Sequence, residues 1–218
     1  QYTKLFFFFF FFAAPEFYSN GFLQEAHIPG FYRGEEDLFF MGKFLNSDRL
    51  LGIEHKQLEL FSSVLRDSNG SPVADPGLPD DNYRMVIPGE DAAEEISSVY
   101  REVFPSYPFP IHDPGYIRKT MRENVAYFGI MHNERLAAIS SAEIDREGKN
   151  AEMTDFATLD EYRGKKFSVI LLREMEKKMK SDGIRMLYTI ARLNSIPMNK
   201  TFLREDYQYA GTLIKNTN

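Results

Sequence analysis

Residues 150–168 read NAEMTDFATLDEYRGKKFS, and this stretch determines how we interpret the rest of the chain. Its first half, Glu152 to Leu159, has the apolar content expected of a strand. The cationic turn EYRGKK follows, and apolar residues then recur at helical spacing as far as Gly183. A basic turn therefore leads into a helix N-terminus, where unpaired N–H groups and the helix dipole favour an anion.

The turn and the helix resemble motif A of the GNAT acyltransferase superfamily, whose signature is Arg/Gln-x-x-Gly-x-Gly/Ala. Arg163 takes the first position, Lys166 the first glycine position and Ser168 the last, so the pattern is broken at Lys166. The longer runs MTDFATLDEYRGKK and GIRMLYTIARLNSIPMNKTFLREDYQYAGTLIKNTN resemble one GNAT subfamily, the β-lysine N-acetyltransferases. The resemblance covers residues 82–218 and, more loosely, 21–45.

The resemblance implies an α+β fold, in which helices flank a mixed, mostly antiparallel sheet. Over residues 82–218 we expect a GNAT N-acetyltransferase domain with the element order β-α-α-β-β-β-α-β-α-β. The strand after the long helix should span Met186 to Ala191. A GNAT fold usually has a further strand beyond the residues recorded here, so missing residues, the N-terminal hairpin or a second subunit of a homodimer would complete the sheet.

The N-terminal residues 1–66 predict a smaller region consisting of a hairpin and a helix. Two strands, 22–28 and 37–44, are expected on either side of a break at Pro29-Gly30. This smaller α/β region resembles half of a GNAT unit, and a generic β-hairpin explains it equally well. Residues 67–81, DSNGSPVADPGLPDD, have the composition of an exposed linker.

Composition restricts the class of protein. A net charge of −6 argues against a nucleic-acid partner, which usually requires an excess of basic residues. Cysteine is absent, which excludes disulfides, thiolate metal sites and a cysteine nucleophile, and fits a cytoplasmic protein. The run Phe6 to Phe12 is far shorter than the ~20 residues of a membrane helix, and we interpret it as a buried strand. We expect no metal and no membrane partner.

By the resemblance, acetyl-CoA is the co-substrate. The basic turn would hold its diphosphate, and the motif strand would bulge, part from its neighbour and pair with the pantetheine arm. The N–H of Phe156 would face the thioester oxygen and stabilise the negative charge that develops there. The expected cofactor-binding residues are Phe156, Ala157, Thr158, Arg163, Gly164, Lys165, Lys166, Phe167, Ser168, Asn194 and Asn199.

Glu152 is the candidate general base, because several GNAT enzymes place a glutamate at this strand position. Side chains alternate along a strand, so Glu152, Thr154 and Phe156 share a face if no bulge intervenes, whereas a bulge turns Asp155 inward. Phe202 stands where many GNAT enzymes have a tyrosine that protonates the thiolate. The expected catalytic residues are Glu152, Asp155 and Phe156. The expected substrate-binding residues are Glu152, Asp155, Tyr188 and Arg192.

The resemblance implies acetylation of the ε-amino group of β-lysine to give the compatible solute Nε-acetyl-β-lysine, and hence a role in osmoadaptation. Two alternatives remain open. The amine can be a different one, such as a protein lysine, a polyamine or an antibiotic. The domain can also bind acyl-CoA without turnover, which the departures at Lys166 and Phe202 favour.

Overall fold

The structure, a computed structural model, describes residues 3–10, 14–51, 55–67 and 74–216 of the 218-residue chain. The chain forms two compact units. The sheet unit comprises Ser71–Ala191, and the flanking unit comprises Gln1–Gly70 together with Arg192–Asn218. In the described residues, no helix combines the length and the apolarity that crossing a membrane requires.

The sheet unit contains a five-stranded sheet in the order β4-β5-β6-β7-β8. Its neighbours pair antiparallel except β7 and β8, which run parallel. Asn133 forms the tight β5–β6 turn with φ of 53°, a left-handed conformation that asparagine tolerates well. The strands are β4 (Tyr83–Val86), β5 (Val125–His132), β6 (Arg135–Asp145), β7 (Asn150–Thr158) and β8 (Met186–Tyr188).

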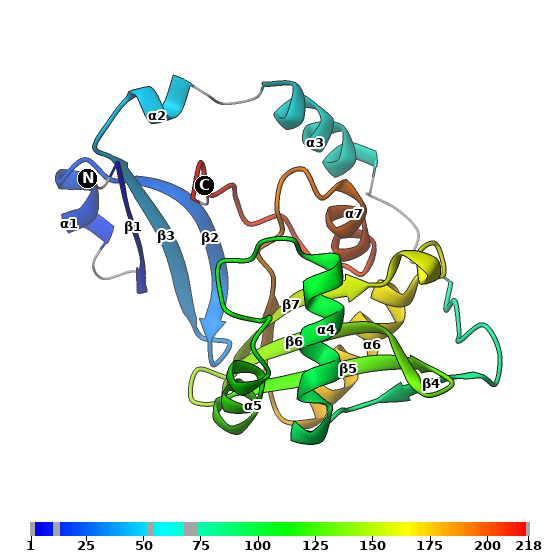
Figure 1. The fold of residues 1–218 in the computed structure, drawn as a ribbon. Helices are drawn as coiled ribbons and strands as arrows, with labels where there is room; N and C mark the ends of the chain where they lie inside the picture. Colours follow the sequence, from blue (N-terminus) through cyan, green and yellow to red (C-terminus); the bar gives the residue numbers. More distant parts are fainter. Residues whose placement is uncertain (1–2, 11–13, 52–54, 68–73, 217–218) are drawn as a thin grey trace. The chain divides into compact units, whose positions relative to one another are not determined.

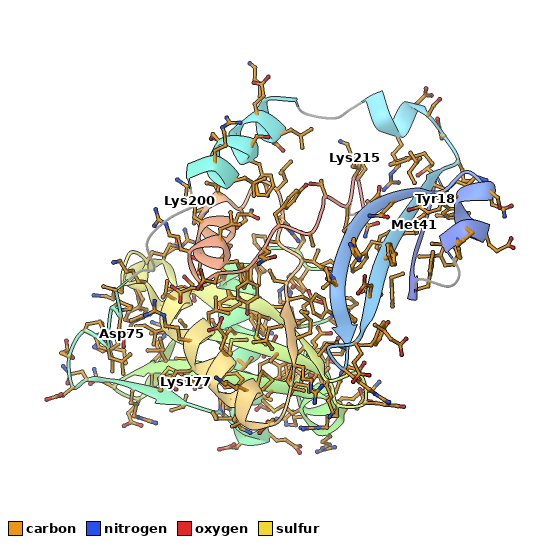
Figure 2. The ribbon with its side chains drawn as sticks, turned by 180° about the vertical axis from the view of Figure 1, so that it is seen from behind. Tyr18, Met41, Asp75, Lys177, Lys200 and Lys215 are labelled. Atoms are coloured by element: carbon orange, nitrogen blue, oxygen red, sulfur yellow. The ribbon has the colours of Figure 1, made fainter. Side chains whose placement is uncertain are left out.

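Helices cover both faces of this sheet, with α4 (Ala93–Val103) and α5 (Pro114–Glu123) on one face and α6 (Phe167–Ser181) on the other (Figure 1). Short 3-10 turns precede α4 (Glu90–Ala92) and α6 (Asp160–Tyr162). The apolar stripe of α6 is buried against the sheet, whereas Lys177 projects from the outer side of the helix (Figure 2). This amphipathic pattern is the reason why α6 docks in one orientation.

The flanking unit has a three-stranded antiparallel sheet in the order β1-β3-β2, with Met41 fully buried in it (Figure 2). Phe17 of α1 packs on Phe9 and Phe22. Helix α3 contacts α7. The elements are β1 (Lys4–Phe10), α1 (Ala14–Ser19), β2 (Leu23–Tyr32), β3 (Glu36–Phe44), α2 (Asp48–Leu51), α3 (His55–Asp67) and α7 (Ile196–Arg204).

Two predictions of local structure need correction. Strand β2 continues through Pro29-Gly30 to Tyr32, because a β-bulge and a left-handed Gly30 (φ 60°) absorb the expected break. The phenylalanine run forms a strand as far as Phe10, but Phe7 and Phe8 are 45% and 61% exposed, because β1 lies at a sheet edge. Phe11 and Phe12 lie outside the described residues.

The grouping of the C-terminal segment differs from the expected 82–218 domain, since Arg192–Asn218 falls in the flanking unit. The reason is local contact: α7 packs on α3, and Gly211 forms an isolated β-bridge with Ala26. In the described part after α7, this isolated bridge stands in place of the last strand of the expected element order. Residues 74–81 lack regular structure and 68–73 lie outside the described residues, so the linker boundary and the likeness of residues 1–66 to half a GNAT unit stay predictions.

Candidate active site

An extra residue in β7 defines the centre of the site. Two steps along β6, from Ile139 to Ser141, face three steps along β7, from Ala157 to Thr154. The surplus residue is accommodated at Asp155, whose φ of 55° is left-handed. Such a bulge re-aims side chains and increases the local twist. It overturns the simple alternation in which Phe156 shares a face with Glu152, and Ala157 takes that position instead.

The ladder between β7 and β8 is short. It runs from Asn150–Met186 to Glu152–Tyr188, and β7 then continues alone to Thr158. The expected strand to Ala191 is therefore too long, because the strands part after Tyr188. Glu152 occupies the point of parting, where its carboxylate accepts hydrogen bonds from the Ile190 N–H and the Tyr188 side chain. The structure thus has the divergence of strands that a bound pantetheine arm requires.

Two glutamates face each other beside this gap. Glu143 of β6 is the direct cross-strand neighbour of Glu152, on the sheet face that α4 and α5 cover. Burial and the nearby charges of Glu143 and Asp155 raise the pKa of Glu152 to about 7. The pKa of Glu143 is also raised, because its carboxyl group is partly desolvated and lies near Asp155, although the residue as a whole is exposed.

Two hydroxyl groups hold Asp155 in place. Tyr107 donates a hydrogen bond to Oδ1 of Asp155, and the Ser141 hydroxyl donates to Oδ2 over 2.7 Å. Tyr107 comes from the irregular segment between α4 and α5, so that segment is tied to the bulge. Burial and the Asp155 charge raise the pKa of Tyr107, which keeps it a proton donor.

Three further tyrosines surround the carboxylates. Tyr100 of α4 is fully buried, and its hydroxyl has no hydrogen-bond partner within the described chain. Burial first, and then the charge of Asp155, raise its pKa. Tyr127 shares a 3.0 Å hydrogen bond with Thr120, and burial raises its pKa to about 12. Burial and the nearby Glu143 raise the pKa of Tyr116. The site is thus acidic and polar, and part of it is shielded from solvent.

The basic turn lies between β7 and α6. Its backbone is left-handed at Gly164 (φ 82°) and again at Lys166 (φ 60°), the residue that precedes α6. Glycine adopts this conformation without strain, which explains why the family pattern has glycine where Lys166 stands. Lys166 keeps the same geometry, and no side chain caps the first N–H groups of α6. The turn therefore fits an anion such as a diphosphate.

The residues around the turn are held by aromatic packing. Tyr162 stacks edge-on against His132 and Tyr83, and the Lys165 ammonium lies 5.8 Å from the centre of the Tyr83 ring. Arg163 forms a 2.8 Å ion pair with Asp160. These contacts hold the backbone from which the cationic side chains of the turn extend.

Comparison with known proteins identifies the family. The Acetyltransferase (GNAT) family profile matches residues 92–204. The chain belongs to the GNAT acetyltransferase family. It is 41% identical over 216 residues to a protein of Methanococcus maripaludis named beta-lysine N(6)-acetyltransferase, covering 99% of this chain and 77% of that one. A Methanosarcina mazei protein of the same name is 29% identical over 199 residues, with coverage of 91% and 72%.

The solved structures agree on the fold of this GNAT protein. An aminoglycoside acetyltransferase from an uncultured soil metagenomic sample superposes with a TM-score of 0.52, covering 64% of this chain and 96% of that one. At 13% identity, this likeness supports the fold alone. The family match and the 41% identical relative show that the chain is an acetyl-CoA-dependent N-acetyltransferase.

The structure brings together only some of the predicted residues. Glu152, Asp155 and Tyr188 lie in one cluster, and the residues of the turn form a second group. Phe167 is buried at the start of α6, so it offers the cofactor its backbone alone. Ala157 is buried and Phe156 and Thr158 are half-buried along β7.

Arg192, Asn194 and Asn199 belong to the flanking unit. The Asn199 amide donates to the carbonyls of Arg192 and Ser195 at 2.9 and 3.0 Å, so it orders the start of α7. Asn194 is exposed, and Phe202 is 5% exposed and packs on Tyr207. The roles assigned to these residues stay predictions.

Sequence reasoning missed Glu143, Tyr107, Ser141 and Tyr100. Glu143 could have been predicted from the sequence. It is an acidic residue near the end of the apolar strand that precedes the motif strand, which makes it a candidate cross-strand neighbour of Glu152. Tyr107 could not have been predicted, since it lies in a proline-rich segment whose path the sequence does not specify.

Replacing Lys166 tests the strained turn. We expect Lys166→Gly to leave the free energy of unfolding unchanged or to raise it by up to about 1 kcal/mol, because a left-handed Cβ is unfavourable. The matched Lys165→Gly, at a residue without positive φ, should lower it by about 0.5–1 kcal/mol. Urea unfolding measures both. Equal losses in the two variants would contradict the assigned strain.

Proposed function

We propose that this GNAT enzyme transfers the acetyl group of acetyl-CoA to the N6 amino group of β-lysine. The observation that carries the proposal is the carboxylate cluster at the parting of β7 and β8, where a cationic amine is attracted and can lose a proton. The activity named for the relatives from Methanococcus maripaludis and Methanosarcina mazei supports this choice of amine.

Glu152 acts as the general base in this proposal. A pKa of about 7 keeps a large share of the carboxylate ionised at neutral pH, while leaving it basic enough to accept a proton from an ammonium group. The released lone pair attacks the thioester carbonyl carbon, the carbon–sulfur bond breaks, and coenzyme A leaves as a thiolate. The hydrogen bond from the Ile190 N–H holds the Glu152 carboxylate at the point where the strands part.

Asp155 is assigned a different role. Its two oxygens accept hydrogen bonds from the Tyr107 and Ser141 hydroxyls, which hold this carboxylate and its charge beside the base. That charge attracts the substrate ammonium and contributes to the raised pKa of Glu152. The proposed division of labour is therefore one carboxylate that moves a proton and one that does not.

The turn from Arg163 to Ser168 would bind the diphosphate of acetyl-CoA. Its left-handed residues and the uncapped start of α6 direct backbone N–H groups outward, and its lysines supply positive charge. Along β7, Ala157 and Thr158 would contact the pantetheine arm, and the Phe156 N–H would stabilise the oxyanion. The tyrosine hydroxyl at Tyr188 is one proton source for the thiolate.

The finer biological role follows from the amine. Nε-acetyl-β-lysine carries one ammonium and one carboxylate and is therefore neutral overall, which suits a compatible solute that accumulates during osmoadaptation in the cytoplasm. This role and a homodimeric state remain proposals. A different cationic amine, such as a polyamine, would also be attracted by the acidic cluster.

The deciding experiment measures coenzyme A release by the purified protein with acetyl-CoA and a panel of amines. We expect β-lysine to have a kcat/KM well above those of α-lysine, a polyamine, an aminoglycoside and a lysine-containing peptide, because its two amines and carboxylate match the relatives' named substrate. Mass spectrometry of the product locates the acetyl group at N6. Preference for another panel member would replace the assigned amine, and acetyl-CoA binding without turnover would favour the non-catalytic alternative.

Substituting the two carboxylates separates their roles. We expect Glu152→Gln to lower kcat by at least about 100-fold, the usual contribution of a general base. Asp155→Asn should mainly raise KM for the amine. Glu174→Gln, on α6 at the opposite face of the sheet, is the matched control and should retain wild-type kinetics. Loss of kcat in Asp155→Asn with an active Glu152→Gln would reverse the assignment.

The pH profile tests the raised pKa. Because Glu152 must be ionised to accept a proton, kcat/KM should rise about tenfold per pH unit at acidic pH and level off above about pH 7. In Asp155→Asn this limb should move to lower pH, since one of the charges that raise the pKa of Glu152 is gone. An unmoved limb would mean that another group controls it.

A further inference from the structure

We propose that Glu143 binds a second ammonium group of the amine substrate, while Glu152 receives the reacting one. The enzyme would therefore select aliphatic amines that carry two ammonium groups over those with one. This inference rests on the proposed function, since it names the specificity-determining residue of the same site.

The position of Glu143 is the first observation. It lies directly opposite Glu152 across the β6–β7 ladder, so the two side chains leave the sheet on the same face. Glu143 is exposed, whereas Glu152 is held at the parting of the strands. Glu143 therefore offers an exposed carboxylate directly beside the proposed base.

The charge balance is the second observation. Neighbouring acids of the sheet unit have basic partners: Glu90 pairs with Arg122, and Glu94 pairs with Arg118. Glu143, Glu152 and Asp155 form no ion pair with any described residue, although each lies in the electrostatic range of the others. Neighbouring negative charges repel one another, and a bound cation relieves the repulsion. Besides the base Glu152, the cluster has the carboxylates of Glu143 and Asp155. A single ammonium group would leave one of these charges without a counterion.

A buried hydroxyl provides an independent sign of a ligand. Tyr100 is fully buried, and its hydroxyl makes no hydrogen bond of normal geometry to the described residues, although the Ser141 hydroxyl is near enough to lower its pKa. The charge of Asp155 lies near it as well. Buried polar groups are nearly always hydrogen-bonded in folded proteins. A buried phenol oxygen beside Asp155 without a well-formed hydrogen bond is typical of a site that accepts a hydrogen-bond donor, such as an ammonium group.

Aromatic walls suit the chain between the two amines. Tyr116 of α5 is half-buried near Glu143, and Tyr107 reaches the cluster from the segment between α4 and α5. Tyrosine rings offer apolar surface to methylene groups and a favourable face to a cation. The surroundings of Glu143 therefore fit an aliphatic diamine better than a single amine.

The test compares two substrates that differ in one group. β-Lysine is 3,6-diaminohexanoate, and 6-aminohexanoate has the same chain and the same reacting amine without the second amino group. We expect the ratio of their kcat/KM values, which favours β-lysine in the wild type, to fall about tenfold in Glu143→Gln, mainly through KM for β-lysine. Any change in the basicity of Glu152 affects both substrates alike and cancels in this ratio.

Glu134→Gln is the matched control, because Glu134 is an exposed glutamate in the turn at the far end of β6. Its ratio should equal that of the wild type, and Glu143→Asp should recover part of the preference. As an independent probe, 1,4-diaminobutane against 1-aminobutane should show the same loss in Glu143→Gln, since neither carries a carboxylate.

The outcomes are distinguishable. If wild-type protein turns over β-lysine but Glu143→Gln leaves both ratios unchanged, the proposed subsite is refuted while the proposed function stands. If the wild type acetylates other diamines with the same dependence on Glu143 but not β-lysine, the named amine fails and the subsite stands. Equal wild-type rates with diamines and monoamines would refute the selection of diamines.

Discussion

One extra residue in β7 is the constraint on which the site depends. At Asp155 the ladder with β6 gains a residue, and the backbone enters the left-handed region to absorb it. This places Asp155 within hydrogen-bonding distance of Ser141 and Tyr107, while Glu152 keeps its cross-strand position opposite Glu143. The same stretch of β7 is where β8 leaves the sheet. A regular strand would not bring Asp155 to Ser141 and Tyr107.

The electrostatics of the cluster oppose folding and support chemistry. Because the pKa of Glu152 is raised from 4.5 to about 7, the folded protein binds this proton more tightly than the unfolded chain. The resulting stabilisation is complete below pH 4.5 and is lost as the pH rises through about 7. At neutral pH the protein therefore keeps a partly ionised, poorly compensated carboxylate, a state typical of functional sites.

The basic turn shows how a family pattern can change while its geometry is kept. Gly164 and Lys166 both adopt left-handed backbone, and only one of them is glycine. The backbone of Lys166 is strained in this conformation, and its side chain adds a positive charge where the fold favours an anion. Aromatic contacts among Tyr83, His132 and Tyr162 anchor the residues before the turn, so its position does not depend on the glycine pattern alone.

The sequence by itself determined the family, the α+β fold, the motif strand, the basic turn and the helix that follows, because these depend on local pattern and on a contiguous motif. It also indicated Glu152 and Asp155, but left the face of Asp155 open, since alternation cannot reveal where a bulge falls. Only the tertiary structure decided that Glu143 faces Glu152, that Tyr107 holds Asp155, and that Arg192–Asn218 packs with the N-terminal residues. These relations join residues far apart in the chain, and the physical reason is that strand register and helix docking, rather than local propensity, determine which side chains meet.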